Sequence, residues 1–143
     1  MSNKELSASL QNYIQAIYAL TSRGDEGVRI IDIAAHLGVT KTSAFVAMKK
    51  LEKEQLIFRD VYRLVCLTEQ GEYQAVLALD KVEIIRTFFV DVLGIPSEIA
   101  EADAKALEHI TSIETLCHIC RYNYKNCNKP QCSENCHLKS RSV

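Results

Sequence analysis

Residues 40–55 read TKTSAFVAMKKLEKEQ, and the ten residues before them read IIDIAAHLGV. With Val28 and Arg29 before them, the two segments predict a helix from Val28 to Leu37, a tight turn at Gly38, and a second helix entered through Thr40. Glycine gives the turn a backbone without a Cβ atom. The Thr40 hydroxyl can accept a hydrogen bond from the first turn of the second helix. The stretch therefore predicts a helix-turn-helix.

Each of these helices has one apolar face. Helical spacing brings together Ile30, Ile33, Ala34 and Leu37 in the first helix, and Ala44, Ala47, Met48 and Leu51 in the second. The other face of the second helix has short hydrogen-bonding side chains at its start and lysines towards its end. In a DNA major groove, such side chains reach base edges or phosphates. The candidate DNA-binding residues are Thr40, Lys41, Thr42, Ser43, Lys49 and Lys50. The alternative is a helical hairpin that binds nothing.

The next segments, LIFRD and YRLVCLT, are rich in β-branched and aromatic residues. A short turn near Asp60 and Val61 joins them, which predicts a two-stranded hairpin. A hairpin directly after the second helix is the wing of a winged helix-turn-helix. Arg59 and Arg63, near the tip, are further candidates for contact with DNA phosphates, and ordinary solvated strand charge is the alternative.

Helical patterns flank this motif. Residues 6–22 predict a helix with an apolar face, and residues 69–93 predict a long helix that is apolar enough to need burial on more than one side. Ser97 is expected to cap a further helix, and Ser112 to begin a short last one. The predicted fold is mainly α with a small β-hairpin: a winged helix-turn-helix plus a helical dimerisation domain. A homodimer through residues 71–112 would cover the excess apolar surface.

Composition excludes several classes of protein. The chain has 143 residues, 48% of them hydrophobic, so a packed core is expected. No apolar run approaches the ~20 residues that span a membrane, and the N-terminus has no signal-peptide pattern. These features predict a cytoplasmic protein without a membrane partner. The sequence also contains no nucleophile–base pattern and no glycine-rich phosphate loop, so we do not expect an enzyme.

Charge divides the chain into three segments. Residues 1–70 hold nine Lys and Arg against eight Asp and Glu, residues 71–116 hold three against nine, and residues 117–143 hold five against one. The acidic middle segment is not expected to face DNA. We therefore expect a DNA-binding domain at residues 1–70, a dimerisation and effector domain at 71–116, and a separate tail at 117–143.

The tail contains five of the six cysteines, in the segment CHICRYNYKNCNKPQCSENCHLK. Their spacing is C-x2-C-x6-C-x4-C-x3-C, formed by Cys117, Cys120, Cys127, Cys132 and Cys136. Four thiolates suit tetrahedral Zn²⁺ or an iron–sulfur cluster, and the spacing does not choose between them. His118 and His137 are further candidate ligands, and disulfides are the alternative. The sixth cysteine, Cys66 in the wing, is expected to be an ordinary buried thiol.

Several short motifs stand in an order that resembles a known family. They are NYIQAIYAL, DIAAHLGV, KKLEKEQLI, LTEQGE, FFVDVLGI and DAKALEHITS, within residues 7–116. The sequence resembles the diphtheria-toxin-repressor family of metalloregulators, most closely its short manganese-responsive, MntR-like branch. The resemblance implies a homodimer on a palindromic operator that represses genes of metal uptake or homeostasis when the effector metal is bound.

The resemblance also implies a metal site, from which this chain departs. Positions that supply ligands in the family hold other residues here: Asn12, Gln15, Val82 and Lys105. Only Glu108 and His109 stand as the family has them. Amides and valine are poor ligands for Mn²⁺ or Fe²⁺, and a lysine ammonium repels the ion. The pair is therefore expected to be a remnant without metal, with Lys105 as a built-in cation in the emptied site.

Together these features predict a DNA-binding transcriptional regulator of metal or iron homeostasis or of a redox response. Sensing is expected to have moved to the cysteine tail. The alternative is a winged-helix interaction module that docks on a partner such as a metal transporter, an analogy at the level of the fold. Sequence-specific, salt-sensitive DNA binding would separate the two hypotheses.

Overall fold

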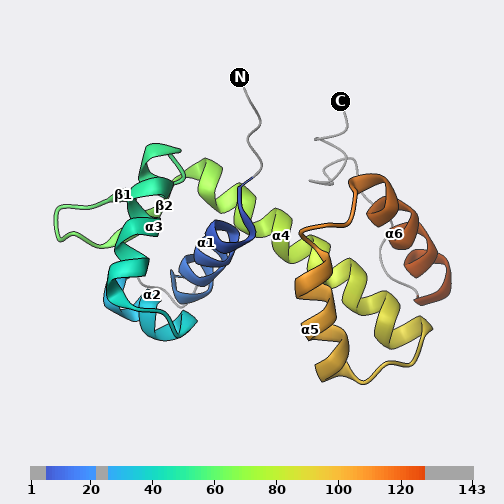
Figure 1. Ribbon diagram of the computed structural model, residues 1–143. Coiled ribbons are helices and arrows are strands. Elements are labelled where there is room, and N and C mark those ends of the chain that lie inside the picture. Colours follow the sequence, from blue (N-terminus) through green and yellow to red (C-terminus); the bar gives the residue numbers. More distant parts are fainter. Residues whose placement is uncertain (1–5, 22–25, 128–143) are drawn as a thin grey trace. The chain divides into compact units, whose positions relative to one another are not determined.

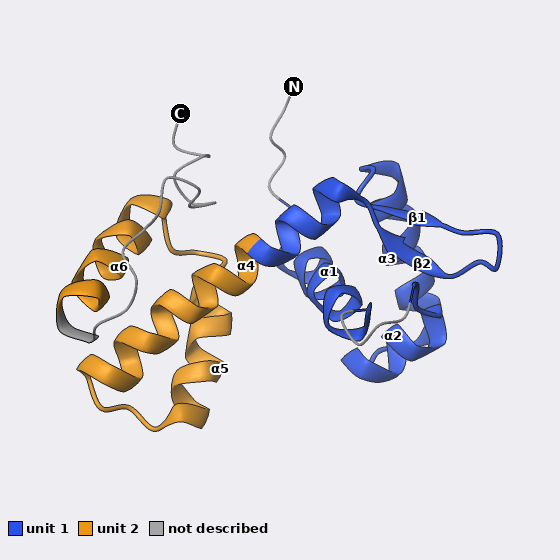
Figure 2. Cartoon of the chain, turned by 180° about the vertical axis from the view of Figure 1, so that it is seen from behind, with its two compact units in different colours: residues 1–76 blue, residues 77–143 orange. Residues whose placement is uncertain are grey.

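The structure is a computed structural model that describes residues 6–21 and 26–127 (Figure 1). The chain divides into two compact units, residues 1–76 and residues 77–143 (Figure 2). Helix α4 (Glu69–Thr87) begins in the first unit and continues into the second.

The first unit contains three helices and a two-stranded hairpin before α4. Its elements are α1 (Ala8–Thr21), α2 (Ile30–Leu37), α3 (Lys41–Lys53), β1 (Ile57–Arg59) and β2 (Val65–Leu67). The strands pair antiparallel, with Phe58 opposite Cys66. This order confirms the predicted winged helix-turn-helix.

The start of α2 differs from the prediction. Val28, expected inside the helix, instead forms a β-bridge with Val65, and their backbones exchange hydrogen bonds of 2.9 and 2.7 Å. Helix α2 begins only at Ile30. Val28 is a β-branched residue between a glycine and a helix, and the edge of the hairpin supplies backbone partners that a frayed first turn would lack.

The turn between α2 and α3 has the predicted chemistry. Gly38 adopts the left-handed conformation with φ of 67°, which favours a residue without Cβ. The Thr40 hydroxyl oxygen accepts a hydrogen bond of 3.1 Å from the backbone N–H of Ser43 and so caps α3. The apolar faces of α1, α2 and α3 meet in one core. Its fully buried side chains include Ile14, Ile17, Ile33, Met48 and Leu51.

The second unit contains the rest of α4, a π-helical turn η1 (Phe88–Val92), α5 (Ser97–Leu107) and α6 (Ile113–Cys127). The sequence predicted one continuous helical pattern over residues 69–93 and did not indicate the π-helical turn. Gly94, with φ of 71°, follows the end of η1. Figure 1 shows α5 and α6 flanking the C-terminal part of α4.

The starts of α5 and α6 differ in how they are capped. Ser112, expected to begin the last helix, directly precedes α6, and its hydroxyl accepts a hydrogen bond of 3.2 Å from the backbone N–H of Thr115. Ser97 does not cap α5, because the residue before the helix is Pro96 and no side chain caps it. Pro96 fixes the entry of the chain through its own restricted φ angle, so Ser97 becomes the first helical residue.

No single helix in residues 6–21 or 26–127 is long and apolar enough to cross a membrane. The helix-turn-helix pair passes such a test only when its two helices are taken together, and they are bent by 113° at the turn.

Candidate nucleic-acid interface and metal ligands

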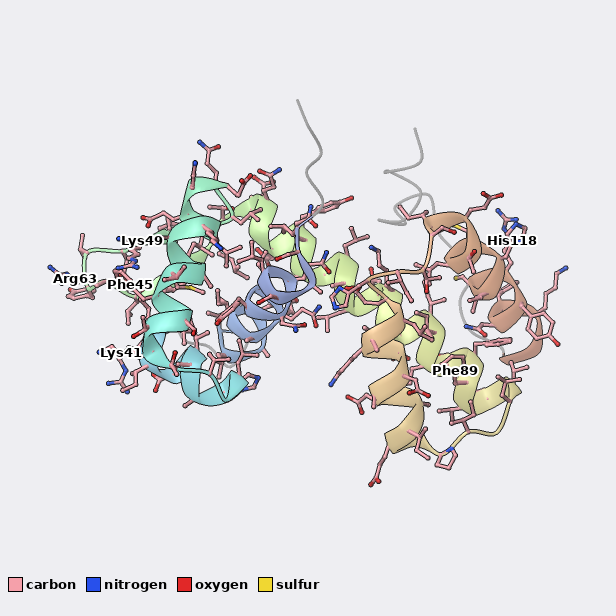
Figure 3. All side chains as sticks on the ribbon, in the orientation of Figure 1. Lys41, Phe45, Lys49, Arg63, Phe89 and His118 are labelled. Carbon is pink, nitrogen blue, oxygen red and sulfur yellow. The ribbon has the colours of Figure 1, made fainter. Side chains whose placement is uncertain are left out.

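Helix α3 separates its buried apolar residues from the predicted DNA-binding residues. Ala44, Met48 and Leu51 are fully buried. The predicted residues are all exposed on the opposite side or at the cap: Thr40, Lys41, Thr42, Ser43, Lys49 and Lys50. Figure 3 shows Lys41, Phe45 and Lys49 in succession along one side of the helix. This side of the helix presents exposed positive charge.

Thr40 and Ser43 have local roles within this face. Besides accepting from the Ser43 backbone, the Thr40 hydroxyl donates a hydrogen bond of 2.9 Å to the Ser43 hydroxyl. Their side chains therefore stabilise the start of α3 before any DNA contact is made. Lys41 and Thr42 follow directly on the exposed surface.

The wing brings its two predicted arginines to different places. Arg63 is exposed in the turn between the strands (Figure 3), where the Asp60 carboxylate accepts hydrogen bonds from the backbones of Tyr62 and Leu64 at 2.9 and 2.8 Å. Arg59 is only partly exposed. Its guanidinium carbon lies 5.2 Å from the centre of the Phe45 ring, so it packs on α3.

Phe45 is a residue of this face that the sequence interpretation did not include. Its side chain is 40% exposed, and the Lys49 ammonium lies 4.9 Å from the ring centre. The sequence carried a signal, because Phe45 does not fit the buried spacing of Ala44, Ala47, Met48 and Leu51. An aromatic residue outside the apolar face of an amphipathic helix points to a surface role.

Glu108 and His109 form a close pair at the end of α5. The His109 Nδ1 atom lies 3.2 Å from Oε2 of Glu108, whose side chain is only 1% exposed. Within residues 6–21 and 26–127, neither carboxylate oxygen has a hydrogen-bond partner. Burial raises the pKa of the Glu108 carboxyl, while His109 and Lys81 oppose that rise. A carboxylate in this state is costly, because water no longer solvates it.

Lys105 does not act as the built-in cation that the sequence suggested. Its ammonium forms a 3.0 Å ion pair with Glu101 one turn earlier on the exposed side of α5. The groups that oppose the rise in the pKa of Glu108 are His109 and Lys81 of α4, and Lys105 is not among them. Residues four apart on a helix are neighbours, so Lys105 pairs with Glu101 on the exposed side of α5 and not with the buried Glu108 carboxylate.

The cysteines of the tail are only partly within the described residues. Cys117 and Cys120 lie three residues apart on α6, both half-buried and present as thiols, and His118 is exposed on the same helix (Figure 3). Cys127 is the last residue of α6. Cys132, Cys136 and His137 lie outside the described residues. In the described part of the chain, no three His, Cys, Asp or Glu side chains gather as a metal site.

Comparisons with known proteins bear on both units. A family model for the iron dependent repressor, metal binding and dimerisation domain matches residues 68–136. The transcriptional regulator MntR of Escherichia coli O6:H1 is 36% identical over 107 residues, which cover 75% of this chain and 68% of that protein. The chain belongs to the diphtheria-toxin-repressor family of metalloregulators.

One further relative and one solved structure are also similar to this chain. An uncharacterized HTH-type transcriptional regulator of Methanocaldococcus jannaschii is 29% identical over 111 residues, covering 78% of this chain and 89% of that protein. A manganese-dependent transcriptional repressor in complex with manganese shares the fold, with a TM-score of 0.71 and 24% identity. That likeness covers 79% of this chain, and the chain spans about half (51%) of the repressor's length.

Family membership corrects one expectation about the tail. The resemblance was expected to stop near residue 116, but the match to the diphtheria-toxin-repressor family's dimerisation domain extends to residue 136. The segment that carries Cys117, Cys120, Cys127, Cys132 and Cys136 therefore lies within the matched length of that domain. Within that matched length, Cys117, Cys120 and Cys127 lie on α6.

The side chains that this member retains do not fit the family's metal. Glu108 and His109 supply one carboxylate and one imidazole, whereas Mn²⁺ and similar ions take about six mostly oxygen ligands. Asn12 is exposed on α1 and Lys105 pairs with Glu101, so neither adds an anionic ligand. Val82 has no donor atom. Glu108 and His109 therefore offer two donor groups, too few to complete a site for the family's ion.

Proposed function

We propose that this chain is a DNA-binding transcriptional repressor of metal or iron homeostasis, or of a redox response, which acts as a homodimer on a palindromic operator. The observation that carries the proposal is the exposed side of α3, where lysines line a helix whose other side is buried. Lysines on such a face can neutralise phosphates on both sides of a major groove. Relatives named as transcriptional regulators support the same conclusion.

A homodimer is supported by the second unit. The matched domain is described as a dimerisation domain. Large apolar side chains are exposed on this unit, including Leu93 at 56%, Ile99 at 54% and Ile110 at 79%. A two-fold axis would pair such patches and present two copies of α3 to successive half-sites, about one helical turn of DNA apart.

The effector is proposed to bind at the cysteines of the tail. Glu108 and His109 are too few to bind the family's ion, whereas Cys117 and Cys120 are neighbours on one helical surface because they are three residues apart. With two of Cys127, Cys132 and Cys136 they could complete a four-thiolate site for Zn²⁺ or an iron–sulfur cluster. Such a site would also tie the segment after α6 to the helix.

DNA binding is tested by selection from a pool of random duplexes, followed by affinity measurements over a series of salt concentrations. We expect one palindromic sequence to be enriched. The slope of log affinity against log salt is negative, and for the Lys50→Ala variant it should become less steep by about 0.9, the effect of one lost phosphate contact. Lys105→Ala, which removes a lysine paired with Glu101 on α5, serves as the charge-matched control and should leave the slope unchanged. Absence of any enriched sequence, with and without effector, would overturn the proposal.

The effector site is tested on protein purified without oxygen, by analysis of bound metal and acid-labile sulfide. Iron with sulfide would identify a cluster, and stoichiometric zinc without sulfide would identify a zinc site. The Cys117→Ser and Cys120→Ser variants should lose the bound metal and its effect on operator affinity. Metal content that survives both substitutions would remove the tail cysteines from the proposal and leave the DNA-binding part standing.

A further inference from the structure

The exposed side of α3 carries two large apolar side chains between its lysines. Phe45 is 40% exposed and Val46 is 48% exposed, although the unit has a well-filled core on the other side of the helix. Figure 3 shows Phe45 between Lys41 and Lys49 along α3. Exposing an aromatic ring and a valine on the same turn forfeits the free energy that their burial would give. Their position is therefore informative about what this side of the helix contacts.

Two cationic side chains lie close to the Phe45 ring. The Lys49 ammonium lies 4.9 Å from the ring centre, and the Arg59 guanidinium carbon of strand β1 lies 5.2 Å from it. Cations at these distances are attracted to the negative face of the ring. The Nε atom of Arg59 is buried and has no hydrogen-bond partner within the described residues. The arginine is therefore positioned by its contact with the Phe45 ring, and it restricts the ring's orientation.

The positive charge around Phe45 and Val46 indicates what kind of molecule this surface binds. The apolar pair is bordered by Lys41, Lys49 and Lys50, all exposed. The occupant must therefore present apolar groups set among negative charges. The DNA major groove has this pattern, because phosphates line its edges and its floor carries one kind of apolar group, the C5-methyl group of thymine.

We propose that Phe45, together with Val46, recognises thymine methyl groups in the operator, and that Arg59 is a positioning residue that orients the Phe45 ring. The inference rests on the proposed function, since it names how the same helix distinguishes bases. Lysine contacts with phosphate carry no sequence information, so the apolar pair supplies part of the specificity that the lysines cannot.

The test replaces each thymine of the selected operator, one at a time, by deoxyuridine, which removes only the methyl group. For the wild-type protein, at least one position in each half-site should bind about fourfold more weakly, the effect of one buried methyl group. In Phe45→Ala that difference between thymine and uracil should disappear, while Phe45→Leu should keep part of it. Phe58→Ala removes another exposed aromatic, in β1, and should leave the difference intact. Thermal unfolding of each variant verifies that it folds.

The role of Arg59 is tested in the same assay with Arg59→Gln. If Arg59 is a positioning residue, the substitution should reduce the difference in affinity between thymine and uracil operators and leave the salt slope unchanged. If Arg59 instead contacts a phosphate, the slope should become less steep by about 0.9 and the difference should remain. The second result would overturn the assignment of Arg59.

The outcomes separate this inference from the proposed function. An enriched operator whose uracil variants bind as tightly as the parent, or whose methyl effects persist in Phe45→Ala, would overturn thymine recognition by Phe45 and leave a DNA-binding regulator. Failure to enrich any sequence would overturn both.

Discussion

The side-chain amide of Asn123 donates a hydrogen bond of 2.9 Å to the main-chain carbonyl oxygen of Ile84. Asn123 is only 4% exposed, and beside it the rings of Phe88 and Tyr122 meet edge to face with their centroids 5.9 Å apart. These contacts join α6, the helix of Cys117 and Cys120, to α4 and η1. A ligand bound by the cysteines would therefore act on a helix that is already attached to the core of its unit.

Replacing Asn123 by alanine should lower the free energy of unfolding by about 1–3 kcal/mol, because a buried hydrogen bond is lost and a cavity remains. Chemical denaturation of the full chain measures the effect. Lys125→Ala, on the exposed side of the same helix, is the control and should change stability by less than about 0.5 kcal/mol. Equal effects of the two substitutions would contradict a structural role for the Asn123–Ile84 bond.

Replacing Glu108 by glutamine should stabilise the protein by about 1 kcal/mol in the presence of a chelator, because a neutral amide is less costly to bury than a carboxylate without hydrogen-bond partners. Glu101→Gln, on the exposed side of α5, is the matched control and should have little effect. Because two donor groups are too few for a tight site, we expect the wild type to bind Mn²⁺ only weakly and Glu108→Gln to bind it with the same affinity. Loss of tight Mn²⁺ binding in this variant would instead show that the family's ion still binds here.

Cys66 should make stability depend on pH in the alkaline range. Burial, with smaller contributions from Asp60 and Glu26, raises the pKa of its thiol above the ordinary value of 9.0. Above pH 9 the unfolded chain therefore loses this proton before the folded chain does, and the stabilisation is lost as pH rises through the folded pKa. Below pH 9 the contribution is fully present.

The measurement for Cys66 is the difference in unfolding free energy between the wild type and Cys66→Ala. That difference should be constant from pH 7 to about pH 8.5 and should shrink above pH 9. Using the difference cancels the titration of lysines and tyrosines that both proteins share. The Cys66 thiol also donates to the Glu26 carbonyl oxygen at 3.0 Å. Alkylation of Cys66 in the folded protein should therefore be slower than alkylation of Cys117.

Two glycines of the first unit should respond differently to alanine. At Gly71, a Cβ atom would overlap the main-chain carbonyl oxygen of Leu56, which cannot move without shifting the hairpin. Gly71→Ala should therefore lower the free energy of unfolding by about 3 kcal/mol. Gly38 has open space around it and only its φ of 67° disfavours a side chain, so Gly38→Ala should cost about 1 kcal/mol. Denaturation curves that reverse this order would contradict the packing of α4 against Leu56.

The helix-turn-helix could be predicted because each of its signals is local. Gly38, Thr40 and the buried spacing from Ala44 to Leu51 all lie within a few residues of the structure that they specify. The hairpin was predicted for the same reason. Helix α6 was predicted to begin after Ser112 but to be shorter than it is, since the polar and cysteine-rich sequence beyond Asn123 does not indicate a helix.

The features that the sequence did not indicate depend on partners far along the chain. Val28 pairs with Val65, and Arg59 packs on Phe45 across the junction of wing and helix. Nothing near Val28 specifies its partner, because that pairing forms only once the hairpin is folded. Glu108 was identified through the family resemblance, but its lack of hydrogen-bond partners is a property of the folded unit alone.

The π-helical turn at Phe88–Val92 accommodates one residue more than an ordinary α-helical turn. Loss of one residue here would convert it to a regular α-helical turn. Each residue of an α-helix rotates the next by about 100°. A one-residue deletion in the regular part of α4 would therefore rotate everything after it, whereas a one-residue deletion within Phe88–Val92 removes the extra residue of the turn and keeps that orientation. A change of chain length is therefore tolerated more readily at this turn than earlier in the helix.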